Sequence, residues 1–162
     1  MIYLRLGVNI MFDLINNIPN RPFVGLFGTC NDSNWRNELI PQLKVPFFNP
    51  VITDGSWNES CRQVEEQAKS RAHILLYVIT PEMIGIYSIA ELVISACKST
   101  RSTDIVVVFL EKYGSKEFTN EQSKSIAATK ALLRQTTTAI ILESLQVTAD
   151  FINKRINWWE NK

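Results

Sequence analysis

Apolar runs and polar, helix-period segments alternate along the chain from Phe23 onward. Five short runs rich in β-branched and aromatic residues predict strands, and the stretches between them carry the 3.6-residue period of helices. The predicted strands are residues 23–28, 46–49, 73–79, 104–110 and 138–142. The predicted helices are residues 34–43, 59–72, 89–97, 119–135 and 144–159. The pattern therefore predicts a succession of strand–helix units.

Most of the predicted strands are nearly continuous apolar runs rather than alternating ones. Such strands are buried on both faces, which favours parallel pairing with helices on each side of the sheet. We therefore expect a three-layer α/β domain with a five-stranded parallel sheet. Right-handed crossovers leave few topologies, and the flavodoxin-like order 2-1-3-4-5, numbered along the chain, is the expected one. The single domain covers residues 23–162, after an N-terminal extension of residues 1–22.

Composition limits the function classes. The 162 residues are 46% hydrophobic and 20% charged, which suits one globular domain with a sizeable core. With 17 basic and 16 acidic residues and no basic cluster, we expect neither a nucleic-acid polymer nor a membrane surface as partner. The apolar runs are too short to span a membrane. The extension lacks the charged start and unbroken apolar core of a signal peptide.

Cysteine and histidine usage argues against several kinds of site. Cys30, Cys61 and Cys97 are widely spaced and odd in number, which favours reduced thiols and a cytoplasmic location. There is no paired-cysteine motif, and the single histidine, His73, begins a predicted strand. We therefore expect no metal, no cofactor, and no Cys/His or Ser/His catalytic pair.

Glu91 is the only charged residue between Met83 and Cys97. It falls in the first turn of a predicted helix that follows the strand 73–79 and is expected to be mostly buried, which is where α/β folds place reactive groups. Burial there would make its ionisation tunable. A second interpretation is structural, because Ser88-x-x-Glu91 is also a capping box, like Ser56-x-x-Glu59 and Thr119-x-x-Gln122.

The expected topology favours the functional interpretation of Glu91. Strands 23–28 and 73–79 are neighbours in that order, and their following helices lie on opposite faces, so a ligand crevice is expected at their carboxyl ends. Loops 28–35 and 80–88 meet there. The first loop offers backbone N–H groups to a polar or anionic ligand, or is a plain turn capped by Asp32, Ser33 or Asn34. It contains neither a Walker motif nor a dinucleotide fingerprint.

The loop after the second predicted strand reaches the same crevice. Asn49, Asp54 and Trp57 lie on it, and an aromatic ring with polar groups suits a planar base and a sugar. Asp54-Gly55 is equally a turn signal, which is the structural alternative for Asp54.

Five short motifs, in this order, resemble the nucleoside 2-deoxyribosyltransferase-like family. The resemblance covers residues 23–98, and beyond residue 104 only the general fold is similar. The motifs are Phe27-Gly28-Thr29-Cys30-Asn31, Trp35-Arg36 with Glu38-Leu39-Ile40-Pro41, Phe48-Asn49-Pro50-Val51, Tyr77-Val78-Ile79-Thr80-Pro81, and Tyr87-Ser88-Ile89-Ala90-Glu91.

The resemblance implies cleavage of the N-glycosidic bond of a (deoxy)nucleoside or nucleotide. Glu91 matches the family's nucleophile, which forms a covalent glycosyl intermediate that is passed to a free base or to water. The family's other acidic residue falls at Glu65, with Glu66 adjacent to it. Asp54 is the first candidate to assist the departing base, and Glu65 the second. The expected substrate-binding residues are Gly28, Thr29, Cys30, Asn31, Trp35, Asn49, Trp57, Met83, Tyr87 and Ser88.

Two other functions stay open at this stage. One is a catalytically silent nucleotide-binding or signalling module, and the other is an enzyme that cleaves the nicotinamide–ribose bond of a dinucleotide. Neither crevice loop carries Lys or Arg, which favours nucleosides over nucleotides.

A homo-oligomer is also expected. The adjacent Trp158 and Trp159 cannot both face inward on a helix, so one of them is expected at or near a subunit contact. The family resemblance also implies oligomers.

Overall fold

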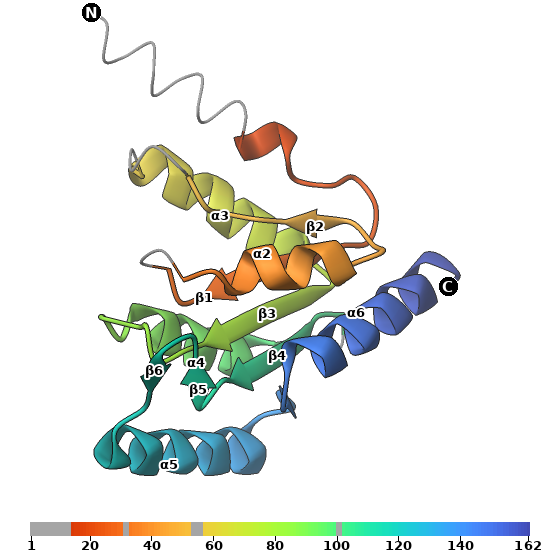
Figure 1. Ribbon diagram of the computed structural model, residues 1–162. Helices are drawn as coiled ribbons and strands as arrows, with labels where there is room; N and C mark the ends of the chain where they lie inside the picture. Colours follow the sequence, from red (N-terminus) through yellow and green to blue (C-terminus); the bar gives the residue numbers. More distant parts are fainter. Residues whose placement is uncertain (1–13, 31–32, 53–56, 100–101) are drawn as a thin grey trace, which may run out of the picture.

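A computed structural model describes residues 14–30, 33–52, 57–99 and 102–162. Five parallel strands form its main sheet, in the order β2-β1-β3-β4-β7 (Figure 1). The strands are β1 (Val24–Gly28), β2 (Phe47–Phe48), β3 (Ile74–Ile79), β4 (Asp104–Phe109) and β7 (Ile140–Leu142). Because β7 is the fifth predicted strand, the expected order 2-1-3-4-5 is confirmed.

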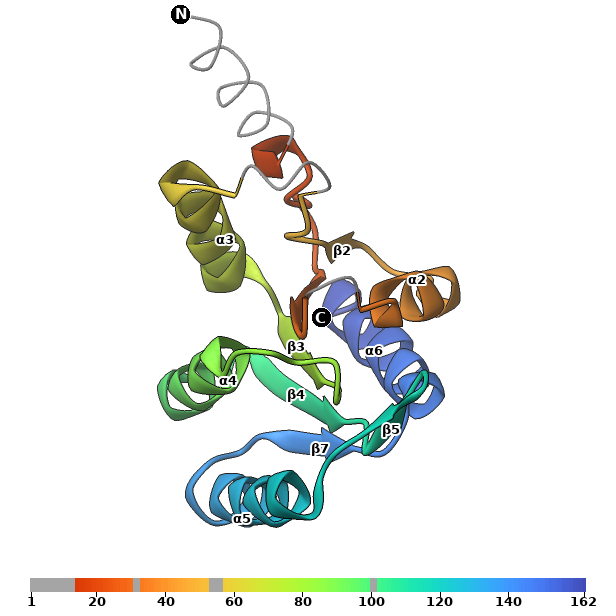
Figure 2. The ribbon, with the colours of Figure 1, turned by 60° about the vertical axis from the view of Figure 1, so that its left-hand side comes forward.

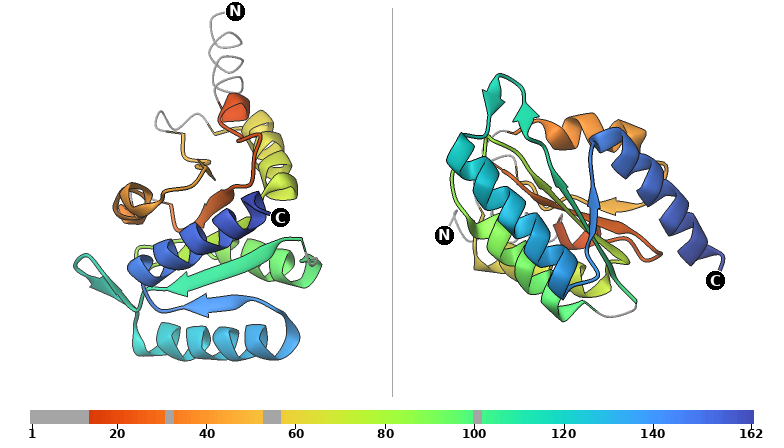
Figure 3. Two further views of the ribbon diagram at one scale, coloured as in Figure 1. Left: turned by 90° about the vertical axis from the view of Figure 1, so that its right-hand side faces the viewer. Right: turned by 90° about the horizontal axis from the view of Figure 1, so that it is seen from below.

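Helices cover both faces of this sheet. They are α2 (Trp35–Leu39), α3 (Glu59–Arg71), α4 (Tyr87–Lys98), α5 (Asn120–Thr136) and α6 (Leu145–Glu160). Figure 2 shows α3, α4 and α5 on one face and α2 with α6 on the other, and Figure 3 shows the same separation from two further sides. The three-layer α/β architecture is thus confirmed.

Each face of the sheet has its own core. Successive residues of β3 point to opposite faces, so Leu75 and Tyr77 pack in one cluster and Leu76 and Val78 in the other. Every residue of β1 and β3 is buried. The prediction of strands buried on both faces is therefore confirmed for the centre of the sheet, while the edge strand β7 is only half-buried.

Two predicted helices have different bounds in the structure. The helix expected over 34–43 ends at Leu39 and continues as a 3₁₀ turn, η1 (Ile40–Gln42). Pro41 has no N–H to continue the α-helical ladder, which explains the change. The helix expected over 89–97 begins two residues earlier, at Tyr87, so Glu91 lies in its second turn rather than its first.

The expectation that the Glu91 helix is mostly buried is wrong. Only Leu92 and Ala96 of α4 are buried, and Ile94 is exposed. The helix rests on the sheet along one narrow stripe, so its other side faces solvent.

A two-stranded antiparallel ribbon was not predicted. It pairs β5 (Lys112–Tyr113) with β6 (Lys116–Glu117) across a turn at residues 114–115, in a stretch for which no helix or strand was predicted. Gly114 takes a positive φ of 58°, which suits that turn. The strands are too short to give an alternation signal.

Residues just before β1 pack against the domain. Leu14 and Ile18 are buried in the cluster that also holds Val64 of α3. Arg71 donates hydrogen bonds to the carbonyl of Pro19 and to Asn20. The described end of the expected extension is thus attached to the domain, while residues 1–13 lie outside the described residues. Among the described helices, none has both the length and the apolar character that a membrane span requires.

The prediction for the last helix, α6, is confirmed in part. Ile152 and Ile156 are buried, Trp158 is exposed, and the half-buried Trp159 packs edge-on against His73 with ring centroids 5.2 Å apart. Arg155 and Lys162 stack over both tryptophan rings. One tryptophan is therefore exposed, as predicted, and the homo-oligomer stays a prediction.

Candidate functional site

A crevice of about 1000 Å³ opens at the carboxyl ends of β1 and β2. Its walls come from the loops after these strands, from α2 and α3, and from the start of α4. It brings together eight of the residues expected at the site from sequence: Gly28, Cys30, Asn49, Trp57, Glu65, Tyr87, Ser88 and Glu91.

A buried lysine joins the two expected catalytic glutamates. Lys69 Nζ lies 2.5 Å from Glu91 Oε1 and 2.9 Å from Glu65 Oε1. All three side chains are at most 15% exposed. Glu66 is 56% exposed and 3.7 Å away, so the structure distinguishes the adjacent glutamates and turns Glu65 toward the crevice. The same ammonium also lies 4.9 Å from the centre of the Phe27 ring.

The pKa values of Glu91 and Lys69 follow from burial and from two carboxylates sharing one cation. Burial raises the pKa of Glu91, the bond from Lys69 works in the opposite direction, and the charge of Glu65 adds to the rise. Burial acts to lower the pKa of Lys69, but Glu65 and Glu91 together outweigh it, so the net shift is upward. The charge of Glu91 also raises the pKa of Tyr87, and both side chains line the crevice.

Gly28 allows the end of β1 to approach β3 closely. Its φ is +123°, and a Cβ there would come within 2.1 Å of the Val78 carbonyl oxygen. The Gly28 carbonyl accepts hydrogen bonds from Ser88 Oγ at 3.0 Å and from the Cys30 thiol at 3.6 Å. Gly28 therefore connects the two strands to α4 at the crevice.

Ser88 does not cap its helix. The N-cap of α4 is Ile86, which makes no side-chain capping bond, and Ser88 donates to β1 instead. The capping-box interpretation of Ser88 and Glu91 is therefore wrong. The prediction for Thr119 and Gln122 is confirmed, since both bonds of that capping box are present. Ser56 lies outside the described residues.

Three expected substrate-binding residues are not among those that line the crevice. Trp35 is fully buried, and its indole N–H donates to the Thr29 carbonyl at 2.8 Å. Thr29 is also buried, and its hydroxyl accepts from the Thr80 N–H at 2.9 Å. Met83 packs against the apolar cluster of α3 and α4. Thr29 and Trp35 thus support the loop from the core side, and sequence alone does not separate such a supporting residue from its neighbours that line the crevice.

Arg36 lines the crevice although sequence reasoning did not select it. Its side chain is buried, and it donates to the carbonyls of Thr29 and Leu26. The sequence signal that could have identified Arg36 was its place in the Trp35-Arg36 motif. Asn31 and Asp54, also expected at the site, lie outside the described residues.

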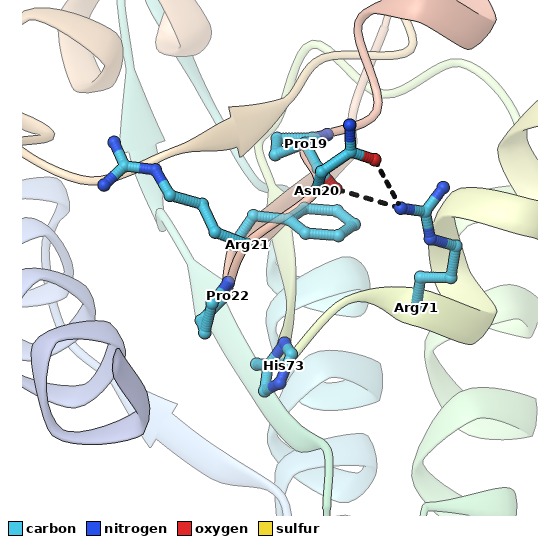
Figure 4. Close-up of a pocket in the computed structure, with 7 residues that line it drawn as sticks. Pro19, Asn20, Arg21, Pro22, Arg71 and His73 are labelled. Atoms are coloured by element: carbon cyan, nitrogen blue, oxygen red, sulfur yellow. Dashed lines mark hydrogen bonds between the residues drawn. The ribbon is translucent and has the colours of Figure 1, made fainter. Parts of the chain in front are cut away.

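A second, smaller cavity of about 280 Å³ lies at the amino ends of β1 and β3, opposite the crevice. Figure 4 shows Arg71 bonded to Pro19 and Asn20 there, with His73 at the start of β3. Its described lining contains no carboxylate. Among the described residues, no group of three His, Cys, Asp or Glu side chains is placed to hold a metal ion.

Comparisons of the chain with protein-family models, with curated proteins and with solved structures found no match. The crevice and its charged cluster therefore carry the functional argument.

Proposed function

We propose that this protein cleaves the N-glycosidic bond of a nucleoside or nucleotide by double displacement at Glu91. The observation that carries the proposal is the buried Glu65–Lys69–Glu91 cluster at the wall of the crevice. Burying two carboxylates around one ammonium costs stability, so such a cluster marks a candidate functional site.

Glu91 has the features that a nucleophile needs. Lys69 holds its Oε1, and among the described residues no hydrogen bond to its other oxygen is formed. That oxygen attacks the anomeric carbon as the carbon–nitrogen bond breaks, and the bonding electrons leave with the base, which takes up a proton. Water or another base then attacks the glycosyl–Glu91 ester.

The geometry of the two glutamates supports retention. Both glutamates bind Lys69 Nζ, Glu65 Oε1 at 2.9 Å and Glu91 Oε1 at 2.5 Å. The distance between these two oxygens therefore cannot exceed the sum of the two bond lengths. Retaining glycosidases place their carboxyl groups about 5–5.5 Å apart, whereas inverting enzymes need about 6.5–9.5 Å to admit a water. Glu65, the second candidate to assist the departing base, also guides the second step, and Asp54, the first candidate, lies outside the described residues.

The test incubates the protein with 2′-deoxynucleosides and their 5′-monophosphates, with and without a free acceptor base, followed by chromatography. A new nucleoside indicates transfer, and free base alone indicates hydrolysis. A mechanism-based 2′-fluoro nucleoside should leave a glycosyl adduct on Glu91, located by mass spectrometry. Binding without turnover or adduct would leave a silent nucleotide-binding module. Nicotinamide release from NAD alone would identify a dinucleotide glycohydrolase.

A further inference from the structure

Arg36 is a buried cation in the crevice wall that forms no salt bridge within residues 14–30, 33–52, 57–99 and 102–162. Its side chain is only 5% exposed, and it lines the crevice beside Gly28 and Cys30. Buried charges are costly unless they are paired. Lys69, which binds the lining residues Glu65 and Glu91, has its carboxylates, whereas Arg36 has none from these residues.

The bonds that Arg36 makes go to backbone carbonyls, so no carboxylate of the described residues compensates its charge. Nη1 donates to the Thr29 carbonyl at 3.0 Å and Nη2 to the Leu26 carbonyl at 3.2 Å, while the guanidinium lies 4.2 Å from the centre of the Trp35 ring. Its Nε is buried without a hydrogen-bond partner. Burial lowers the pKa of Arg36, partly opposed by Cys30 and then by Glu65.

The same crevice therefore contains two different charge environments. Arg36 is close enough to Glu65 to respond to its charge, and Glu65 shares Lys69 with Glu91. A ligand whose anomeric carbon lies at Glu91 occupies the crevice that Arg36 also lines, and the Arg36 guanidinium has no carboxylate partner within the described part of the chain. A planar guanidinium with a free N–H matches a phosphate better than it matches a neutral hydroxyl.

We propose that Arg36 binds the phosphate of a nucleoside 5′-monophosphate, so that the substrate is a nucleotide rather than a nucleoside. This proposal rests on the proposed function for the bond that is cleaved. A phosphate oxygen accepts a hydrogen bond from Arg36 Nε, and the phosphate is unchanged in the reaction. The sequence pointed to nucleosides because the crevice loops carry no Lys or Arg, but Arg36 lies one residue past the first of them.

The kinetic test compares kcat/KM for each 2′-deoxynucleoside with that for its 5′-monophosphate. We expect the intact protein to prefer the monophosphate by about 100-fold, and Arg36→Gln to lose most of this preference through a raised KM. Trp35→Phe is the matched control, because it removes the other donor to the Thr29 carbonyl and keeps the cation. It should retain the preference. If Arg36→Gln fails to fold, Arg36→Lys carries the test, since a point charge loses the fork geometry.

Calorimetry on the Glu91→Gln variant separates the two proposals. Arg36-dependent binding of the monophosphate without any turnover in the intact protein supports the phosphate site and refutes the proposed cleavage. Cleavage at Glu91 with equal kcat/KM for both substrate forms supports the cleavage and overturns the phosphate site. Preference for NAD over monophosphates, or an Arg36→Gln variant that loses stability with an unchanged preference, also overturns it.

Discussion

The ion pairs at the two ends of the strands differ in how many carboxylates share one cation. At the amino edge Arg155 pairs with Asp104, one cation for one carboxylate, and Arg71 donates to Pro19 and Asn20 near the surface (Figure 4). At the carboxyl edge Lys69 is shared by two buried glutamates.

The contrast holds within one helix. Lys69 and Arg71 are two positions apart on α3, so they point to different sides of it. Arg71 ties the segment before β1 to the domain, which is a structural role. Lys69 joins α3 to α4 through carboxylates whose burial a stable fold does not require. Unbalanced, buried charge is the kind of local inconsistency that folds retain at functional sites.

The largest expected effect is a loss of activity, and it should arise at the carboxyl end of the sheet and not at its amino end. Glu91→Gln removes the nucleophile with little change of shape, so kcat/KM should fall by about 10³-fold or more. Asp104→Asn weakens an ion pair at the other edge and should cost about 1 kcal/mol of stability with unchanged kcat/KM. Steady-state kinetics and urea unfolding measure both. Near-normal turnover by Glu91→Gln would remove the assignment of the nucleophile.

The second prediction concerns the backbone that supports the crevice. Gly28→Ala puts a methyl group against the Val78 carbonyl at a positive φ, so we expect a loss of about 3 kcal/mol or failure to fold. Gly85→Ala is the control, because a Cβ there meets nothing within 4 Å. Urea titration gives both values, and equal effects at the two glycines would contradict the close approach of β1 and β3.

The third prediction tests the shared lysine through pH. The pKa of Glu91 is already raised, so the acid limb of kcat/KM should lie above the usual range of a glutamate. Lys69→Met removes the group that opposes this rise. The limb should move to higher pH, and turnover near neutrality should fall by about tenfold.

Stability should respond with a definite sign. A carboxyl whose folded pKa is raised favours folding when protonated, so this contribution is lost as pH rises through that folded pKa. The Lys69→Met variant should therefore lose most stability, relative to the intact protein, at pH values above the folded pKa of Glu91. Arg71→Met, on the same helix, should leave the pH profile in place, and equal shifts in both variants would point to a general charge effect.

The smallest expected effect comes from Ser88. Ser88→Ala deletes one hydrogen bond to the Gly28 carbonyl and should cost about 1 kcal/mol. Thr119→Ala deletes a helix cap and should cost a similar amount. Only Ser88→Ala should also lower kcat/KM, because that bond holds α4 against β1. Thermal unfolding and kinetics on both variants check the difference.

The sequence by itself determined the layers and the strand order. Continuous apolar runs such as residues 74–79 can only be buried on both faces, and the handedness of crossovers then leaves few orders for the strands. The same reasoning placed Gly28, Ser88 and Glu91 at one crevice, and the family resemblance added Glu65.

Only the tertiary structure decided which of these side chains meet. Lys69 and Arg36 look like ordinary helix cations in sequence, because a helical period shows which residues share a face and not which face of a second helix they meet. Trp35 and Thr29 face the core behind the loop, and Ser88 bonds to β1, for the same reason. Contacts between α3, α4 and the end of β1 join residues more than twenty positions apart, and those contacts exist only once the sheet has brought the elements together.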